Sequence, residues 1–385
     1  MKTSLFEFFV PTKILAGEDS LSNLFYELSL LNSKKPIIVT DKGIVNAGLL
    51  KYVEQPLREA GIEYIIFDEV PPDSSLKIVK NIYEIYKQSS CDSIIAVGGG
   101  SVIDSAKGAN ILIAYNSEDL ADIAGADRID RKLKPLIVIP TTSGTGSEVT
   151  SVAVIADEEN GLKLPFASQF LIPDVTVLDA RMTLSLPPIM TAATAMDALT
   201  HALEAYLSLQ KNPISDSFSL TAIKLIFQNL YKVIDDPKNR EYRLNMMIAS
   251  TCAGVAFSNA MVGIVHAIGH TLGGMYKIPH GVAMGILLPA GLEFYYDTRK
   301  AEFEEIIKLL NNFLEEKVKD LIEYVRNVLT RLNALTNLPI KLSDVGVRKS
   351  DFDNIAKMSL NDGSIVFTPK YAGIDDIIKI LEVSY

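Results

Sequence analysis

The chain has few cysteines, fewer basic than acidic residues, and no long apolar run. Its two cysteines, Cys91 and Cys252, are far apart and form no spaced motif, so we expect two reduced, buried thiols. Lysine and arginine number 37 against 47 acidic residues, and the net charge of −10 argues against nucleic-acid binding because it repels phosphate. No apolar run approaches the roughly 18–20 residues that span a bilayer, and Glu7 and Pro11 interrupt the N-terminal stretch where a signal peptide has its apolar region. We expect a cytoplasmic protein that binds neither nucleic acid nor membrane.

The first half of the chain alternates short β-rich runs with helical patterns. A chain of 385 residues exceeds one ordinary core, so two domains are expected. The runs are apolar on both faces, as parallel strands covered by helices must be; they lie at residues 36–40, 63–67, 93–97 and 136–139. Helical patterns at 49–60 and 76–87 separate them. The alternation predicts a Rossmann-like α/β domain with a parallel sheet.

After residue 187 the pattern becomes helical. The predicted helices are 188–208, 214–233, 241–258, 262–274, 280–294 and 301–333. The charged stretch from Lys300 to Lys319 is interpreted as the solvated face of the last of these helices. We therefore predict an α/β dinucleotide-binding domain over 1–182 and an all-α metal-binding domain over 183–385.

All four histidines of the chain fall between His201 and His280. Asp197 and His201 are four residues apart, as are His266 and His270, so each pair shares one face of a helix, with side chains roughly 6 Å apart. A carboxylate in an apolar helical stretch must find a partner. Imidazoles with a carboxylate suit a divalent cation such as Fe²⁺ or Zn²⁺. The spacing predicts three or four protein ligands but leaves open which of His266, His270 and His280 bind.

Two polar loops follow strand-like runs and predict a nucleotide site. Gly98-Gly99-Gly100-Ser101 opens a helix, where the backbone can approach a phosphate closely. It is not the Gly-x-Gly-x-x-Gly dinucleotide fingerprint. Thr141 begins the second loop, Thr-Thr-Ser-Gly-Thr-Gly-Ser-Glu. An open α/β sheet binds its ligand at such strand ends. Asp41, which ends the first run, either accepts hydrogen bonds from an adenosine ribose, favouring NAD over NADP, or caps a helix.

With these motifs in place, the chain resembles the iron-containing (group III) alcohol dehydrogenases over nearly its whole length. The segments that carry the resemblance are Gly98-Gly-Gly-Ser-Val-Ile-Asp104, Pro140-Thr-Thr-Ser-Gly-Thr-Gly-Ser-Glu-Val-Thr150, Asp197-Ala-Leu-Thr-His-Ala-Leu-Glu-Ala-Tyr206, and His266-x3-His270-x9-His280-Gly. Each alone is suggestive, and together they are highly specific.

The resemblance implies a dehydroquinate synthase-like architecture, with the active site in the cleft between an α/β and an all-α domain. It implies that His270 stands near the substrate and nicotinamide as a catalytic residue without binding the metal. The metal ligands would be Asp197, His201, His266 and His280. The cofactor-binding residues would be Asp41, Gly98, Gly99, Gly100, Ser101, Thr141, Thr142, Thr145 and Lys163. It also leads us to expect a homodimer or a higher homo-oligomer.

Two segments depart from the family pattern. Pro72-Asp73-Ser74 stands where the family often has Pro-Asn-Pro, and this weakens the expected adenine-side contact. The family's Asn-Pro-Arg near the C-terminus is replaced within Asn361-Asp-Gly-Ser-Ile-Val-Phe-Thr-Pro369. The metal motif is unaffected by either change.

The resulting hypothesis is reversible hydride transfer between a small primary or secondary alcohol and NAD⁺. A divalent metal, Fe²⁺ first and Zn²⁺ second, would stabilise the alkoxide, and His270 would relay the proton. NADP(H) is the second choice of cofactor. The alternatives are a zinc-dependent glycerol or 1,2-diol dehydrogenase, a dehydroquinate-synthase-like lyase, and a non-catalytic metal or nucleotide binder.

Overall fold

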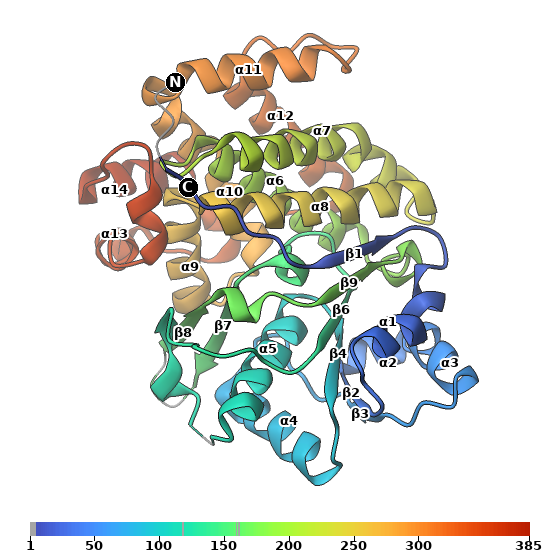
Figure 1. The fold of residues 1–385 in the computed structure, drawn as a ribbon. Helices are drawn as coiled ribbons and strands as arrows, with labels where there is room; N and C mark the ends of the chain where they lie inside the picture. The colour runs from blue at the N-terminus through green and yellow to red at the C-terminus, as the bar shows by residue number, and fades with distance from the viewer. Residues whose placement is uncertain (1–4, 118, 159, 161) are drawn as a thin grey trace. The chain divides into compact units, whose positions relative to one another are not determined.

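The computed structural model describes residues 5–117, 119–158, 160 and 162–385. Contacts within the chain divide it into two units, one over Phe9–Ser185 and one over Leu186–Tyr385 (Figure 1). The segment ending at Phe8 belongs to the second unit, and the Phe8 ring stacks on Phe218 there, with centroids 5.8 Å apart. The sequence pattern predicts a division between residues 182 and 183, whereas the contacts divide the chain between Ser185 and Leu186.

The first unit is built on a six-stranded parallel sheet, which confirms the predicted α/β fold class. Its strands lie in the order β1-β9-β6-β4-β2-β3, and every neighbouring pair is parallel. The strands are β1 (Lys13–Ala16), β2 (Pro36–Val39), β3 (Ile65–Phe67), β4 (Ser93–Gly98), β6 (Leu136–Pro140) and β9 (Val175–Leu178). The helices are α1 (Leu24–Leu30), α2 (Lys42–Asn46), α3 (Lys51–Glu59), α4 (Leu76–Gln88) and α5 (Gly100–Tyr115).

Helices cover both faces of this sheet, which explains why its inner strands are buried and mostly apolar. Successive side chains of a strand point to opposite faces. Ile37 and Val39 of β2 therefore join the core formed with α4 and α5. Ile38, between them, joins the core formed with α1 and α3. Figure 1 shows these two groups of helices on opposite sides of the strands.

A small second sheet, which the sequence pattern did not predict, lies in the same unit. Its order is β5-β8-β7, formed by β5 (Gly125–Ala126), β7 (Val152–Asp157) and β8 (Leu162–Ala167). Strands β7 and β8 pair in antiparallel fashion, and β7 packs on α5. This hairpin carries Lys163 on its second strand.

The second unit is helical, as predicted. Its helices are α6 (Pro188–Leu207), α7 (Pro213–Asp235), α8 (Arg240–Ala260), α9 (Ile264–Tyr276), α10 (His280–Tyr295), α11 (Lys300–Asn311), α12 (Leu321–Thr336), α13 (Phe352–Ser359) and α14 (Ile374–Val383). Helix α6 is central, because it packs against α7, α8, α10 and α12. In the part of the chain that the structure describes, no single helix is long and apolar enough to cross a membrane. The bent pair α8 and α9 reaches that length and apolarity only when the two helices are taken together.

The prediction of one helix over 301–333 is wrong. Helix α11 ends at Asn311, and α12 begins at Leu321. The Asn311 side chain bonds both the backbone N–H and the carbonyl of Val318, which closes a loop. Asp320 then caps α12 by accepting two backbone N–H groups of its first turn. Because local polar side chains form this break, the charge periodicity of the segment did not reveal it.

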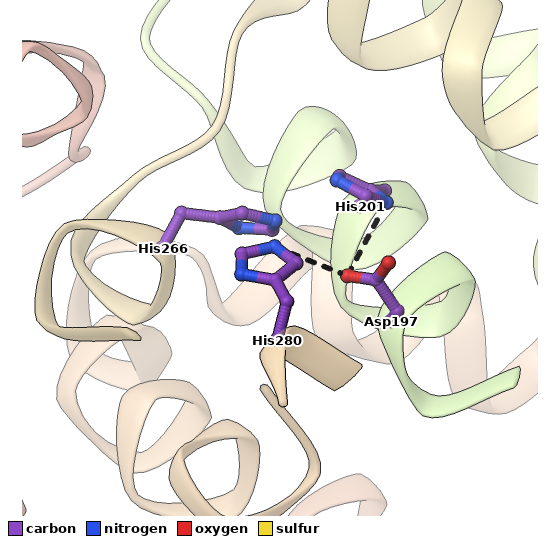
Figure 2. Close-up of side chains that lie close together, drawn as sticks. All are labelled: Asp197, His201, His266 and His280. Carbon is purple, nitrogen blue, oxygen red and sulfur yellow. Dashed lines mark ion pairs between the residues drawn. The ribbon is translucent and has the colours of Figure 1, made fainter. Parts of the chain in front are cut away.

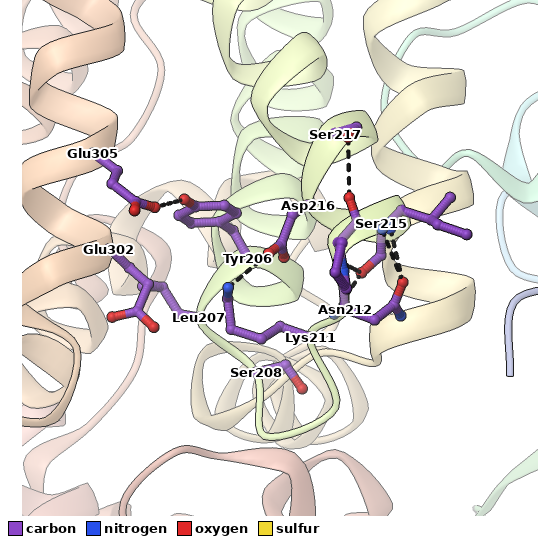
Figure 3. A network of polar contacts seen from close by, with 12 residues as sticks. Tyr206, Leu207, Ser208, Lys211, Asn212, Ser215, Asp216, Ser217, Glu302 and Glu305 are labelled. Atoms are coloured by element: carbon purple, nitrogen blue, oxygen red, sulfur yellow. Dashed lines mark hydrogen bonds and ion pairs between the residues drawn. The ribbon is translucent and has the colours of Figure 1, made fainter. Parts of the chain in front are cut away.

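A polar network secures the turn between α6 and α7 (Figure 3). Lys211 donates to Asp216 at 2.6 Å, and Asn212 caps α7 with its side-chain oxygen. The Tyr206 hydroxyl, near the end of α6, donates to Glu305 on α11. These bonds fix the C-terminal end of α6, the helix that carries Asp197 and His201.

Helices α6 and α10 make a backbone contact at Gly281. A Cβ atom on Gly281 would lie 2.3 Å from the carbonyl oxygen of Ala193. We therefore expect Gly281→Ala to lower the free energy of unfolding by about 1–3 kcal/mol, measured by urea denaturation. Gly274→Ala is the control, because nothing lies within 4 Å of its would-be Cβ, and we expect it to be neutral or stabilising by up to about 1 kcal/mol. Equal effects of the two changes would contradict this close packing.

Candidate metal centre and nucleotide loops

Asp197, His201, His266 and His280 converge within the helical unit (Figure 2). Asp197 and His201 are one turn apart on α6, His266 lies in the first turn of α9, and His280 is the first residue of α10. One potential ligand atom from each of the four lies within 4.8 Å of the others. Three separate helices therefore bring one carboxylate and three imidazoles to a single point.

The electrostatics of this cluster fit a cation. Asp197 is 2% exposed, and burial raises its pKa to about 8. Its Oδ1 lies 3.4 Å from Nε2 of His280 and 3.8 Å from Nδ1 of His201, but accepts no hydrogen bond from any residue that the structure describes. An ionised carboxylate is costly to bury without a charged partner. A divalent cation would supply that partner, and carboxylate with imidazole is a donor set that Fe²⁺ and Zn²⁺ accept.

His266 is buried and held by Glu204, a residue to which the sequence reasoning gave no role. The distance between Nδ1 of His266 and Oε2 of Glu204 is 2.6 Å. Burial lowers the pKa of His266, although the Glu204 carboxylate acts in the opposite direction. Burial opposes ionisation of Glu204, but hydrogen bonds from His266 and Tyr295 hold its pKa below the ordinary value. Glu204 stands seven residues after Asp197, so its helical spacing was the available signal.

His270 lies beside this cluster but is not one of the four converging residues. Its ring stacks on that of His280, with centroids 5.4 Å apart. Its Nδ1 lies 2.9 Å from Oδ2 of Asp362, and 39% of its side chain is exposed. Asp362, also missed by the sequence reasoning, belongs to the divergent segment 361–369. That segment thus supplies a partner for the histidine proposed as catalytic.

The two polar loops of the α/β unit lie side by side, as their strand register requires. Gly98 of β4 is paired with Pro140 of β6, so the loops that follow leave the sheet together. A Cβ on Gly99 would touch Thr142 at 3.4 Å, and one on Gly100 would touch Thr145 at 3.0 Å. Both threonines are partly exposed, whereas Thr141 is buried. The partly exposed glycines open α5, whose first backbone N–H groups suit a phosphate.

Three other predicted cofactor residues have partners in the structure. Asp41 follows β2 and caps α2, accepting the N–H of Ile44 at 2.9 Å, which is the helix-cap alternative considered for it. The Ser101 hydroxyl donates to the carbonyl of Pro72. Lys163 on β8 is 3.8 Å from Asp73 and partly exposed. The Ser101 bond places this side chain against Pro72-Asp73-Ser74, the segment that stands where the family often has Pro-Asn-Pro.

A buried lysine and a mostly buried aspartate of α5 lie behind the two polar loops. Lys107 of α5 is completely buried and donates to the carbonyls of Thr150 and Val152, at 2.7 and 2.9 Å. Burial lowers its pKa to about 8, and burial raises the pKa of Asp104 to about 6. Asp104 accepts the N–H of Val154 at 3.0 Å. Both residues thus tie α5 to the strand that follows the threonine-rich loop.

Comparison with known proteins agrees with this architecture over the whole chain. The model of the iron-containing alcohol dehydrogenase family matches residues 11–180, and the model of the C-terminal part of the Fe-containing alcohol dehydrogenase family matches residues 191–385. A 1,3-propanediol dehydrogenase of Klebsiella pneumoniae is 36% identical, with 100% of both chains covered. An NAD-dependent methanol dehydrogenase of Bacillus methanolicus is 33% identical, covering 97% of this chain and 98% of the relative.

Solved structures give the same result. The crystal structure of a 1,3-propanediol oxidoreductase superposes with a TM-score of 0.93 at 36% identity, covering 99% of this chain and 100% of the other. The resemblance inferred from the motifs is confirmed, and the zinc-dependent alternative is not favoured. The chain belongs to the iron-containing alcohol dehydrogenase family and is an enzyme of the oxidoreductase class.

Proposed function

We propose that this chain is an NAD-dependent, metal-dependent alcohol dehydrogenase that transfers a hydride reversibly between a small primary or secondary alcohol and NAD⁺. The observation that carries this proposal is the convergence of Asp197, His201, His266 and His280 on one point. Membership of the family supports the type of reaction, and the four converging residues support the metal site that the reaction needs. In the oxidising direction an alcohol and NAD⁺ give an aldehyde or ketone, NADH and a proton.

The cluster is proposed to hold Fe²⁺, with Zn²⁺ as the second choice. Asp197 offers a buried carboxylate oxygen, and Nε2 of His266 accepts no hydrogen bond from the described residues. Both atoms are buried acceptors, as a resident cation requires. When bound, the cation supplies Lewis acidity that lowers the pKa of an alcohol by several units, as it does for water. A zinc-dependent glycerol or 1,2-diol dehydrogenase typically uses one carboxylate and two histidines, whereas this chain offers a third histidine.

His270 is proposed to carry the proton of the alcohol to solvent. Its Nδ1 lies 2.9 Å from Asp362, an arrangement that leaves Nε2 as the atom able to exchange a proton. Its partly exposed ring gives the proton a route to water. Asp362 holds the ring in place, as a carboxylate partner does for a general base.

The nucleotide loops are proposed to bind NAD(H). Gly98 to Ser101 would hold the pyrophosphate at the start of α5. Thr141, Thr142, Thr145 and Lys163 would contact phosphates, ribose or nicotinamide. Asp41 would accept hydrogen bonds from the adenosine ribose with the carboxylate oxygen that does not cap α2, and its charge would oppose a 2′-phosphate.

The substrate is proposed to be a short alcohol or diol. The relatives named above act, by their names, on 1,3-propanediol and methanol. Phe257 stacks on His201 with ring centroids 4.3 Å apart, so an apolar ring borders the cluster. An apolar neighbour of this kind favours a short alkyl chain over a heavily hydroxylated one.

We also propose that the chain forms a homodimer and acts in the cytoplasm. The family resemblance supports the first of these features, and the composition of the chain supports the second. Neither feature enters the chemistry of the site.

Removal of the metal should abolish activity. We expect protein stripped by a chelator under anaerobic conditions to lose NAD⁺ reduction, because the cation is the group proposed to offset the negative charge of the alkoxide. Addition of Fe²⁺ should restore the activity, tested with ethanol, butanol, 1,2-propanediol and glycerol. Full activity in protein shown to be free of metal would contradict the proposal.

Substitutions at Asp197 and His270 should separate metal binding from proton transfer. Asp197→Ala is expected to abolish metal retention, since it removes the only carboxylate among the four. His270→Ala is expected to keep the metal while lowering kcat by about 10²-fold or more, as loss of a general acid–base does. Metal content by mass spectrometry and steady-state kinetics on the same samples make the comparison. Full metal content and activity in Asp197→Ala would refute the ligand assignment.

Asp41→Asn should weaken the preference for NAD. Asparagine caps helices as well as aspartate does, so α2 is retained while the charge is lost. We expect the ratio of kcat/KM for NADP⁺ to that for NAD⁺ to rise by on the order of tenfold, which corresponds to about 1.4 kcal/mol of relieved repulsion. Lys42→Gln, on the neighbouring exposed residue, serves as the control. An unchanged ratio would leave Asp41 as a helix cap only.

A further inference from the structure

Glu204 is the most deeply buried carboxylate next to the candidate metal centre, and no role in the reaction described above falls to it. It lies on α6, one turn beyond His201, and is 1% exposed. A carboxylate at that depth is strongly destabilising unless its oxygens receive hydrogen bonds. The question is therefore which groups donate to it.

Both oxygens of Glu204 are engaged by the start of α9 and its surroundings. Oε1 accepts the N–H of Val265 at 2.9 Å and also the hydroxyl of Tyr295. Oε2 lies 2.6 Å from Nδ1 of His266 and accepts the backbone N–H of the same residue at 3.3 Å. The Tyr295 hydroxyl in turn accepts the N–H of Ile264 at 2.8 Å. One carboxylate thus caps helix α9 and holds the ring of a histidine in its first turn.

The backbone at this point is shaped to let the carboxylate approach. A Cβ on Gly263, the residue before α9, would lie 2.4 Å from the Tyr295 hydroxyl and 3.1 Å from Oε1 of Glu204. Only glycine leaves room for this contact. Gly263, Tyr295 and the buried Glu204 therefore pack against one another at the start of α9.

The arrangement favours the tautomer of His266 that carries its proton on Nδ1. An ionised carboxylate can only accept hydrogen bonds, so the imidazole nitrogen that faces it must carry the proton. In a neutral imidazole with the proton on Nδ1, the lone pair is on Nε2. Nε2 of His266 is buried and receives no hydrogen bond from the residues that the structure covers. The ring is thus prepared for a ligand at Nε2 before any ligand binds.

We propose that Glu204 is a positioning residue that presets His266 as a metal ligand by holding its proton on Nδ1. The inference deepens the proposed function and rests on the metal site described there. Partners of this kind on ligating histidines orient the ring and raise its basicity, and their loss costs about 10–100-fold in metal affinity. Glu204 would act through His266 alone and would not touch the substrate.

The first test uses the metal-free wild-type protein, labelled with ¹⁵N on its histidine rings. The chain has four histidines, so the signals of His266 can be assigned by comparison with His266→Gln. We expect long-range ¹H–¹⁵N spectra to show Nδ1 of His266 protonated and Nε2 unprotonated. A protonated Nε2 in this spectrum would overturn the proposal without any reference to metal or activity.

The second test compares Glu204→Gln with a matched control, Tyr295→Phe. Both changes disturb hydrogen bonds of the same buried cluster, but only the first replaces the carboxylate by an amide, whose single oxygen cannot serve both Nδ1 of His266 and the donors at Oε1. We expect Glu204→Gln to mix the two tautomers and to weaken Co²⁺ binding, followed by the visible spectrum of the ion, by about 10–100-fold. Tyr295→Phe should keep the wild-type tautomer and Co²⁺ affinity even if its Tm falls.

The outcomes separate this inference from the proposed metal site. If the wild-type protein binds no Co²⁺, the metal site itself is refuted, and the tautomer spectrum still decides whether Glu204 orients the ring. If Glu204→Gln binds Co²⁺ as tightly as the wild-type protein, the positioning role is refuted while the metal site stands. Equal losses in Glu204→Gln and Tyr295→Phe would assign the effect to helix stability and would also refute the positioning role.

Discussion

The buried carboxylate of Asp197 is the constraint on which the site depends. Within the helical unit it is almost fully shielded from water and faces the rings of His201 and His280 without a hydrogen bond from the described residues. A group in that position is either protonated or compensated by positive charge, because the low-dielectric interior penalises an isolated anion. A divalent cation would resolve the conflict, and the three imidazoles would hold it together with Asp197. The packing of α6, α9 and α10 can be understood as the means of bringing these four groups together.

Two further carboxylates, those of Glu204 and Asp362, contact the histidines of α9. Glu204 bonds Nδ1 of His266, and Asp362 bonds Nδ1 of His270. In the proposed mechanism these contacts leave Nε2 of each ring available, in His266 as a metal ligand and in His270 as a proton carrier. Helix α9 therefore carries two histidines to which we assign different tasks. The carboxylate partner of His266 is deeply buried, and the partner of His270 is partly exposed.

Much of this arrangement could be predicted from the sequence, because its signals are local. The four apolar runs of the parallel sheet, the Gly98–Ser101 turn and the i,i+4 pair of Asp197 and His201 each follow from short-range periodicity. Strands β1 and β9 were missed. Strand β1 begins with Lys13 and is mostly exposed, and it pairs with a segment about 160 residues away. The break between α11 and α12 was missed because Asn311 and Asp320 act through specific side-chain bonds. Long-range partners, such as Asp362 for His270, leave no trace in spacing.

The separation of His270 from the other three histidines illustrates the same limit. By spacing alone His266 and His270 are equivalent candidates for metal ligands. The family resemblance distinguishes them, and the geometry places His270 outside the converging four.

The most direct test of the proposed metal site is a crystal structure of the protein loaded anaerobically with Fe²⁺, with anomalous data collected at the iron edge. We predict one anomalous peak within coordination distance of Asp197, His201, His266 and His280 and not of His270. A peak elsewhere, or one that includes His270 in place of any of the four, would contradict it.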